Sequence, residues 1–390
     1  MFAAFRPRRP FLKGALALTL ASFIAACDPV GLSTGPSINT SKPVPVALLV
    51  PRGSTTSGDA VLAQALENAA RLAMSDLEGV EIDLRVYDTA GDATTAQAAA
   101  LSAVGDGAKI ILGPVRSGTT NAVGVALSGK GVNVLSFSNN ASIAGGNVFV
   151  LGPTFQNTAD RLTSFATRNG KNSFVTVHAQ NVAGDTGRDA IDRAIGQNGG
   201  SNAGSVSYEF SQQGVISAVT EVRDTVRQTG ADAIFLTSGT SDALPLFSQL
   251  LPEAGLSGDS VQYIGLQRWD IPAQTLALPG VQNGWFAMPN PALTGQFRDR
   301  YSAAYGTTPH PIGGLAYDGI AAIGALVKQG NSDALTAAAM TQGAGFQGVN
   351  GIFRLRADGT NQRGLAVATI RDKQVVILDP APRSFGGAGF

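Results

Sequence analysis

The sequence predicts an α/β protein built from two doubly wound parallel-sheet lobes with a cleft between them. Short apolar runs that suit buried strands alternate with segments of helical periodicity between residues 46 and 137, and the alternation returns between residues 173 and 266. The length agrees, because 390 residues exceed what one hydrophobic core usually serves. Each alternating stretch is therefore expected to form one lobe.

The first lobe is expected to begin with VALLV (46–50), a continuous apolar run typical of a strand buried on both faces. Apolar residues then recur every three or four positions from Leu62 to Leu77, which predicts a helix that Gly79 terminates. The remaining elements of this lobe are expected to be strands at 81–88, 109–114 and 132–137, with helices over 94–104 and near 121–128.

The second lobe repeats this pattern. Strands are expected at 173–179, 205–210, 232–237 and 261–266, and helices near 187–197, 216–228 and 243–251. A helix from Ala316 to Val327 then precedes three strands at 351–355, 364–370 and 374–379. We expect a binding domain over 46–380, with lobe 1 at about 46–152, lobe 2 at about 153–300, the later elements shared between them, and a tail at 381–390.

Residues 1–26 have the features of an export signal. A basic leader from Arg6 to Lys13 precedes an apolar run at 15–26, which is far shorter than the ~20 residues of a membrane-spanning helix. The tetrapeptide Ile24-Ala25-Ala26-Cys27 resembles the bacterial lipobox, in which cleavage falls before the cysteine and its sulfur is lipidated. An ordinary export signal is the alternative. A disulfide is excluded, because Cys27 is the only cysteine.

The residues after Cys27 predict a tether to a membrane. The segment 27–45 is rich in Gly, Ser and Pro, which is typical of a flexible linker. Asp28 resembles the inner-membrane retention signal of enterobacterial lipoproteins, so a periplasmic protein anchored to the inner membrane is preferred. Without the leader, 24 basic residues face 28 acidic ones, a net charge of −4. No basic cluster is present, which argues against a nucleic-acid partner.

Four loops at the carboxyl ends of the expected strands are candidates for ligand binding: 51–59, 113–120, 136–142 and 178–187. Each is rich in Gly, Ser, Thr or Asn, whose backbone and side chains offer neutral hydrogen-bond donors. The helix N-terminus at Ser117–Thr120, which includes Thr119, favours an anionic group such as a carboxylate. Turn and helix-cap chemistry recruits the same residue types and is the alternative.

Two segments, 87–142 and 304–326, resemble type I periplasmic binding proteins of the Leu/Ile/Val-binding family. The likeness lies in the order of landmarks: an acidic pair after the second strand, a strand ending in Gly, a Ser-containing turn, and a Pro-rich lead into Ala-Tyr-Asp. It implies a ligand held by hinge closure, with Ser117, Ser138 and Asn140 at the family's anchor positions.

Three positions of the family's site depart from its pattern. Ser57 precedes Gly58 where the family often has an aromatic residue, and Ala179 and Gln267 stand where it has acids. A free amino acid's ammonium group would then lack the charged partner that a buried cation requires. Trp269 either packs in a core or stacks on a ligand from the loop that holds Gln267.

The sequence bears on three classes of function. The resemblance favours a lipid-anchored solute-binding protein that captures a small carboxylate-bearing ligand for an ABC permease. Residues 46–74 are also similar to the binding-protein-like domain of penicillin-binding protein activators, a protein-interaction scaffold. An enzyme is not expected, because His178 and His310 belong to no catalytic or metal-binding motif. No cofactor and no metal are expected, and Asp88 and Asp92 are interpreted as turn and helix-cap residues.

Overall fold

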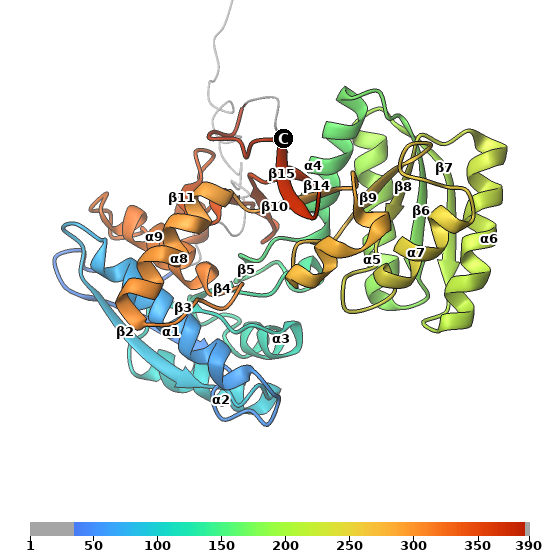
Figure 1. Cartoon of the computed structure of the whole chain (residues 1–390). Helices are drawn as coiled ribbons and strands as arrows, with labels where there is room; N and C mark the ends of the chain where they lie inside the picture. The colour runs from blue at the N-terminus through green and yellow to red at the C-terminus, as the bar shows by residue number, and fades with distance from the viewer. Residues whose placement is uncertain (1–34, 387–390) are drawn as a thin grey trace, which may run out of the picture.

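Two separate sheets, each covered by helices on both faces, organise the computed structural model, which describes residues 35–386 (Figure 1). This arrangement confirms the predicted fold class. The sheets lie in different lobes, and the chain passes from one lobe to the other after β5, after β10 and after β13. No helix within this described range is both long enough and apolar enough to cross a membrane.

The sheet of the first lobe is entirely parallel, in the order β2-β1-β3-β4-β5. Its strands are β1 (Val44–Val50), β2 (Ile82–Asp88), β3 (Ile110–Leu112), β4 (Asn133–Ser136) and β5 (Val148–Val150). The connecting helices are α1 (Asp59–Ser75), α2 (Ala93–Gly105) and α3 (Ser117–Ala126), with the short 3-10 turn η1 (Ala141–Ile143) after β4.

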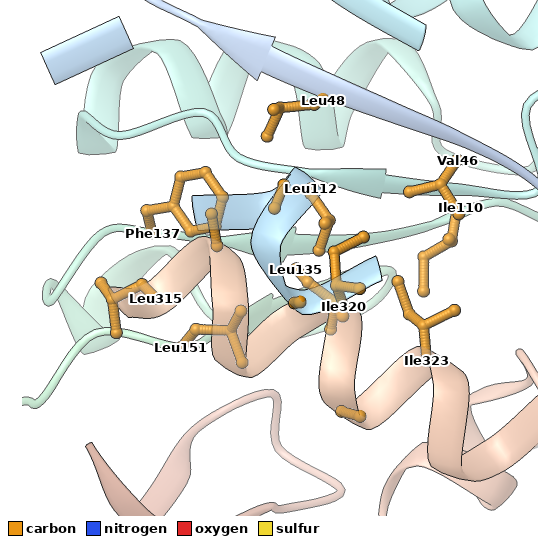
Figure 2. Close-up of a cluster of buried hydrophobic side chains, with 14 of the residues drawn as sticks. Val46, Leu48, Ile110, Leu112, Leu135, Phe137, Leu151, Leu315, Ile320 and Ile323 are labelled. Carbon is orange, nitrogen blue, oxygen red and sulfur yellow. The ribbon is translucent and has the colours of Figure 1, made fainter. Parts of the chain in front are cut away.

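The alternating side chains of β1 show why this strand is apolar throughout. Val46 and Leu48 face the core that contains α1 and α9, shown with its neighbours in Figure 2, whereas Ala47 and Leu49 face α2 and α3. All four are fully buried, and a buried Val or Leu side chain contributes about 1.5–3 kcal/mol. A strand enclosed on both faces leaves no position for a polar residue.

The sheet of the second lobe has the order β15-β14-β10-β9-β8-β6-β7. Strands β6 to β10 pair in parallel, whereas β14 and β15 pair antiparallel. Its N-terminal strands are β6 (Ser173–Ala179), β7 (Ser201–Tyr208), β8 (Ala233–Leu236), β9 (Gln262–Gly265) and β10 (Trp285–Met288). The helices are α4 (Phe155–Arg168), α5 (Val182–Gln197), α6 (Gln212–Thr229) and α7 (Leu244–Glu253), followed by η2 (Ala273–Ala277) and η3 (Pro279–Val281).

The C-terminal elements are divided between the lobes. Helices α8 (Pro291–Tyr305), α9 (Gly314–Val327) and α10 (Ala337–Met340) pack on the first lobe. Strands β11 (Phe346–Gly348), β12 (Gly351–Leu355) and β13 (Asn361–Arg363) form a small antiparallel sheet beside it. Strands β14 (Ala366–Arg371) and β15 (Gln374–Asp379) complete the sheet of the second lobe. The strand expected at 351–355 thus exists in a sheet of its own.

A buried ionic network ties two of the crossovers to α9. Asp318 is fully buried and accepts hydrogen bonds from the backbone N–H of Val349 (2.8 Å) and from Arg363 Nη1 (3.1 Å). Arg363 Nε in turn donates to the carbonyl of Leu151, 2.7 Å away, just after β5. The network therefore fixes the first and third crossovers to the same helix.

Two helices start before the stretches whose periodicity predicts them. Helix α5 begins at Val182, five residues before the expected start near 187, and α3 begins at Ser117, four residues before the stretch at 121–128 but at the helix N-terminus expected at Ser117–Thr120. The first turn of α3 holds only Ser, Gly and Thr, and in α5 Val182 and Ala183 are followed by Gly and Asp, so neither turn continues an apolar helical repeat. In α5 the turn is held by a side-chain cap, because Asn181 Oδ1 accepts from the N–H of Gly184 at 2.8 Å.

Candidate functional site

A cavity of about 260 Å³ lies between the two lobes, beside the three crossovers. The first lobe lines it with Asn139, Pro311, Ile312, Leu315 and Asn350; the second with Phe155, Thr158, Leu266, Gln267, Arg268, Ile271 and Ala287; and the crossovers and their flanks with Pro153, Met288, Pro289, Arg363 and Leu365. Drug-sized ligands usually occupy 300–1,000 Å³, so this cavity suits a smaller solute.

The chemistry of the cavity wall is apolar with a few polar groups. Eleven of the lining residues are aliphatic, proline, methionine or phenylalanine side chains, and four are neutral polar residues. The two charged residues are Arg268 and Arg363, and no aspartate or glutamate lines the space. A solute with an apolar body and a negative or hydrogen-bond-accepting end fits such a wall.

Arg268 is held in place by a neighbouring carboxylate. Its Nε donates to Asp270 Oδ1 at 2.9 Å, and its Nη2 donates to Asp270 Oδ2. Both residues follow β9, at the carboxyl edge of the second sheet. The Arg268 side chain remains 32% exposed, whereas that of Asp270 is 11% exposed, so the aspartate lies behind the arginine.

Gln267 is the one sequence-predicted residue that lines the cavity. Its Nε2 donates to the carbonyl of Thr237, 2.9 Å away at the end of the neighbouring strand β8. Gly239 packs directly against this amide. Only a glycine fits here, because a Cβ at this position would collide with the Gln267 side chain. The amide is thereby fixed against the end of the sheet, with its neighbour Arg268 beside the same space.

Trp269 belongs to the core of the second lobe and not to the cleft. Its side chain is fully buried and stacks on Phe286 with a ring-centroid separation of 6.5 Å. Two glycines provide the space: a Cβ at Gly265 or Gly284 would collide with the indole. The expectation that Trp269 stacks on a ligand is corrected accordingly, because the ring is enclosed by its own lobe.

Ser117 and Thr119 lie in the first turn of α3, at the carboxyl edge of the first sheet. The Thr119 hydroxyl is 2.8 Å from the carbonyl of Arg116 and donates to it, so it closes the helix turn. The half-buried Ser117 hydroxyl makes no hydrogen bond within residues 35–386. Of these two hydroxyls, only that of Ser117 is left for a solute, and neither residue lines the cavity described above.

Ser138 and Asn140 shape the loop after β4. The Ser138 Oγ accepts from the N–H of Asn140 at 3.1 Å, and Asn140 Oδ1 accepts from the N–H of Ser142 at 2.9 Å. Both side chains therefore support a turn. The residue between them, Asn139, is exposed and lines the cavity, although the sequence pattern did not single it out. Its place between two turn-forming residues is the only signal that could have indicated it.

Ser57 is exposed in the turn before α1 and does not line the cavity. Two residues later, the buried carboxylate of Asp59 accepts from Arg116 Nη2 at 2.7 Å, which joins the start of α1 to the residue before α3. This hydrogen bond lowers the pKa of Asp59 below its ordinary value of 3.8. The pair fixes two loops at the carboxyl edge of the first sheet relative to each other.

A second hollow, of about 390 Å³, lies on the first lobe between α1, α8, α9 and β11. The polar groups Asp76, Arg300 and Tyr317 in this hollow already pair with one another, because Asp76 accepts hydrogen bonds from both of the others. One lobe builds all of it, so a change in lobe orientation would not close it. Within the described part of the chain, no group of three His, Cys, Asp or Glu residues is placed to hold a metal ion.

The profile of the periplasmic binding protein family matches residues 43–374. The chain belongs to this family. Membership confirms the resemblance drawn from 87–142 and 304–326, and it assigns the chain to solute-binding proteins and not to enzymes. No curated protein matches the sequence. Cys27 lies outside the residues that the structure describes.

Solved structures share the fold at low sequence identity. A branched-chain amino acid ABC transporter protein from Rhodospirillum rubrum is 18% identical, with a TM-score of 0.73 over 86% of this chain and 100% of that one. An ABC transporter substrate-binding protein from Desulfitobacterium hafniense in complex with Leu is 17% identical, with a TM-score of 0.65 over 86% and 100%. A solute-binding protein from R. palustris in complex with benzoate is 18% identical, with a TM-score of 0.59 over 89% and 98%.

Proposed function

We propose that this protein is the solute-binding component of an ABC-type importer and captures a small carboxylate-bearing ligand between its lobes. The observation that carries the proposal is the interlobe cavity of about 260 Å³, to which both lobes and the crossovers contribute. A solute held there contacts both lobes and the crossovers that join them. Its binding energy can therefore favour the closed arrangement.

The solved relatives support a carboxylate. Leu and benzoate, the ligands of the D. hafniense and R. palustris proteins, differ in their bodies but both carry a carboxylate. In this chain, Ser117 and the free N–H groups at the start of α3 offer first-lobe donors, next to Thr119. Ser138 and Asn140 support the turn after β4, Ser57 lies exposed in the turn before α1, and Gln267 offers an amide on the second lobe.

Closure about the three crossovers is the proposed mechanism. The loops of the first sheet that hold Ser117 and Ser138 would approach the second-lobe edge that holds Gln267. The closed form would then present a surface made of both lobes to a membrane permease. A scaffold role like that of penicillin-binding protein activators needs no such solute, so a solute-dependent change separates the two functions.

A thermal-shift screen of the mature protein tests the proposal. Aliphatic and aromatic acids and amino acids should include at least one solute that raises the melting temperature, as any ligand of the native state does. The shift should shrink in Ser117→Ala/Ser138→Ala and persist in Ser41→Ala, which changes an exposed serine at the opposite edge of the first sheet. No stabilisation by any solute would favour the scaffold role instead.

The anchor is a separate part of the proposal. We expect Cys27 to be lipidated after removal of residues 1–26, with Asp28 favouring retention at the inner membrane. Metabolic labelling with a palmitate analogue checks the expectation. Cys27→Ala should abolish the label, and undiminished labelling of this variant would contradict lipidation at this position.

A further inference from the structure

The charges around the cavity carry information about its solute that the likeness to other proteins does not. Among the described residues that line the cavity, both charged side chains are arginines. Their carboxylate partners, Asp270 and Asp318, are each engaged by one of these arginines and are not lining residues. The cavity therefore offers a cation to a solute but no anion.

Arg363 is not available to a solute. Its side chain is 3% exposed; Nη1 pairs with Asp318 and Nε donates to Leu151, while the guanidinium lies 4.9 Å from the ring centre of Phe353. Its Nη2 is buried with no partner among residues 35–386, so it does not reach open space. The Arg363 charge belongs to the interior of the crossovers.

Arg268 is available. An arginine side chain has five N–H donors, and Asp270 takes one from Nε and one from Nη2. The other donors make no hydrogen bond within the described residues, and the side chain is one-third exposed on the cavity wall. The bidentate contact with Asp270 also fixes the plane of the guanidinium, so little side-chain freedom is lost when a solute binds.

We propose that the solute is a carboxylate with an apolar body and no ammonium group, and that Arg268 receives this carboxylate from the second lobe. The inference rests on the solute-binding function proposed above and names the ligand class of the same cavity. A carboxylate has about four lone-pair sites, so it can accept from Arg268 and at once from a first-lobe donor that lines the same cavity, such as the amide of Asn139. Such a bridge would hold the lobes together.

An ammonium group would have no counter-charge in this cavity. Removing it from water carries an effective penalty of several kcal/mol, and the nearby guanidinium repels it. Leucine, 4-methylpentanoate and 3-methylbutylamine separate the groups, because the second is leucine without its ammonium and the third is leucine without its carboxylate. Benzoate adds an aromatic body to the same comparison.

Calorimetric titration of the mature protein with these four probes decides the matter. We expect 4-methylpentanoate or benzoate to bind, leucine to bind at least tenfold more weakly than 4-methylpentanoate, and 3-methylbutylamine not to bind. Arg268→Gln should weaken carboxylate binding by about tenfold to a hundredfold, the range for a charge-assisted hydrogen bond. Arg268→Lys keeps the positive charge but loses the paired N–H donors of the guanidinium, so its affinity for the carboxylate should lie between those of the original protein and Arg268→Gln. Arg298→Gln, at a 62% exposed arginine of α8, should change nothing.

Two results would overturn the inference while leaving the solute-binding function in place. One is leucine binding as tightly as 4-methylpentanoate, which would place an unrecognised acid in the cavity. The other is unchanged carboxylate affinity in a folded Arg268→Gln variant, checked by its circular dichroism spectrum. If none of the four probes binds and the wider thermal-shift screen is also blank, the proposed function fails, and this inference fails with it.

Discussion

Two arginine–aspartate pairs border the same cavity but differ in how far water can reach them. Arg363 and Asp318, at the crossovers, have side chains that are 3% and 0% exposed. Arg268 and Asp270, on the second-lobe wall, are 32% and 11% exposed. The residue types are the same. They differ in burial and in geometry, since Arg268 makes two hydrogen bonds to Asp270 and Arg363 makes one to Asp318.

The difference in burial indicates a difference in role. The Arg363–Asp318 pair also makes hydrogen bonds to the backbone. Asp318 accepts from the N–H of Val349, between β11 and β12, and Arg363 donates to the carbonyl of Leu151, just after β5. Removing the partner of a charge that is buried in this way lowers the free energy of unfolding by several kcal/mol. The guanidinium of Arg268 keeps donors that the protein does not use. A cation that is positioned but not enclosed is what a solute can bind.

The largest expected effect comes from opening the enclosed pair. Asp318→Asn removes the carboxylate and leaves the Arg363 cation buried with no counter-charge. Breaking a buried pair in this way costs about 3–5 kcal/mol of unfolding free energy. Urea denaturation followed by circular dichroism measures this loss. If the slope of the transition is unchanged, the loss equals the shift in the urea midpoint multiplied by that slope.

Asp299→Asn is the matched control, because the Asp299 side chain is 76% exposed on α8 and its ion pair with Arg298 is open to water. This change should alter the free energy of unfolding by no more than about 0.5 kcal/mol. Equal losses from the two aspartate variants would show that burial does not distinguish these pairs and would remove the basis of the comparison.

Elements that are defined by a local sequence pattern could be predicted from the sequence. The apolar run at 46–50 and the repeat from Ala316 to Val327 predict β1 and α9, because burial on both faces and helical periodicity are local properties. It could not divide the C-terminal elements between the lobes. That α9 covers the first sheet while β14 extends the second depends on packing between residues far apart in sequence.

The candidate site was harder to predict, because side-chain direction depends on neighbours from other segments. Trp269 follows the end of a strand, a position from which a side chain can stack on a ligand. Its indole instead packs in the core, in the space that Gly265 and Gly284 leave. Arg268, one position earlier, faces the cavity. Adjacent residues in a loop thus differ in role, and no local pattern distinguishes them.

A pair of intermediate burial sharpens the comparison. Asp59 is buried, with a side chain 5% exposed, whereas Arg116 is 40% exposed. Arg116→Gln removes the hydrogen bond that lowers the Asp59 pKa and leaves a buried carboxylate that water reaches only partly. We expect a loss of about 1–2 kcal/mol at pH 7, between the values for enclosed and surface pairs.

The pH dependence of this loss follows from the direction of the pKa shift. A carboxyl whose pKa is lowered on folding adds stability above its ordinary pKa of 3.8, and this contribution disappears as the pH falls through the folded-state pKa. The gap between the original protein and Arg116→Gln should therefore narrow as the pH falls from 7 to about 3. A gap that stays constant over this range would mean that the guanidinium acts by packing and not by charge.

The smallest expected effect on stability comes from removing the cavity-wall pair altogether. Arg268→Gln/Asp270→Asn deletes both charges, so no ion is left unpaired, and a partly exposed pair contributes at most about 1 kcal/mol. Its affinity for 4-methylpentanoate should nevertheless fall by about tenfold to a hundredfold, as for Arg268→Gln alone, because the aspartate does not touch the solute. Denaturation and calorimetry on the same preparation measure both quantities. A loss of several kcal/mol with unchanged affinity would make this pair as structural as Arg363 and Asp318, and the solute would then need another cation.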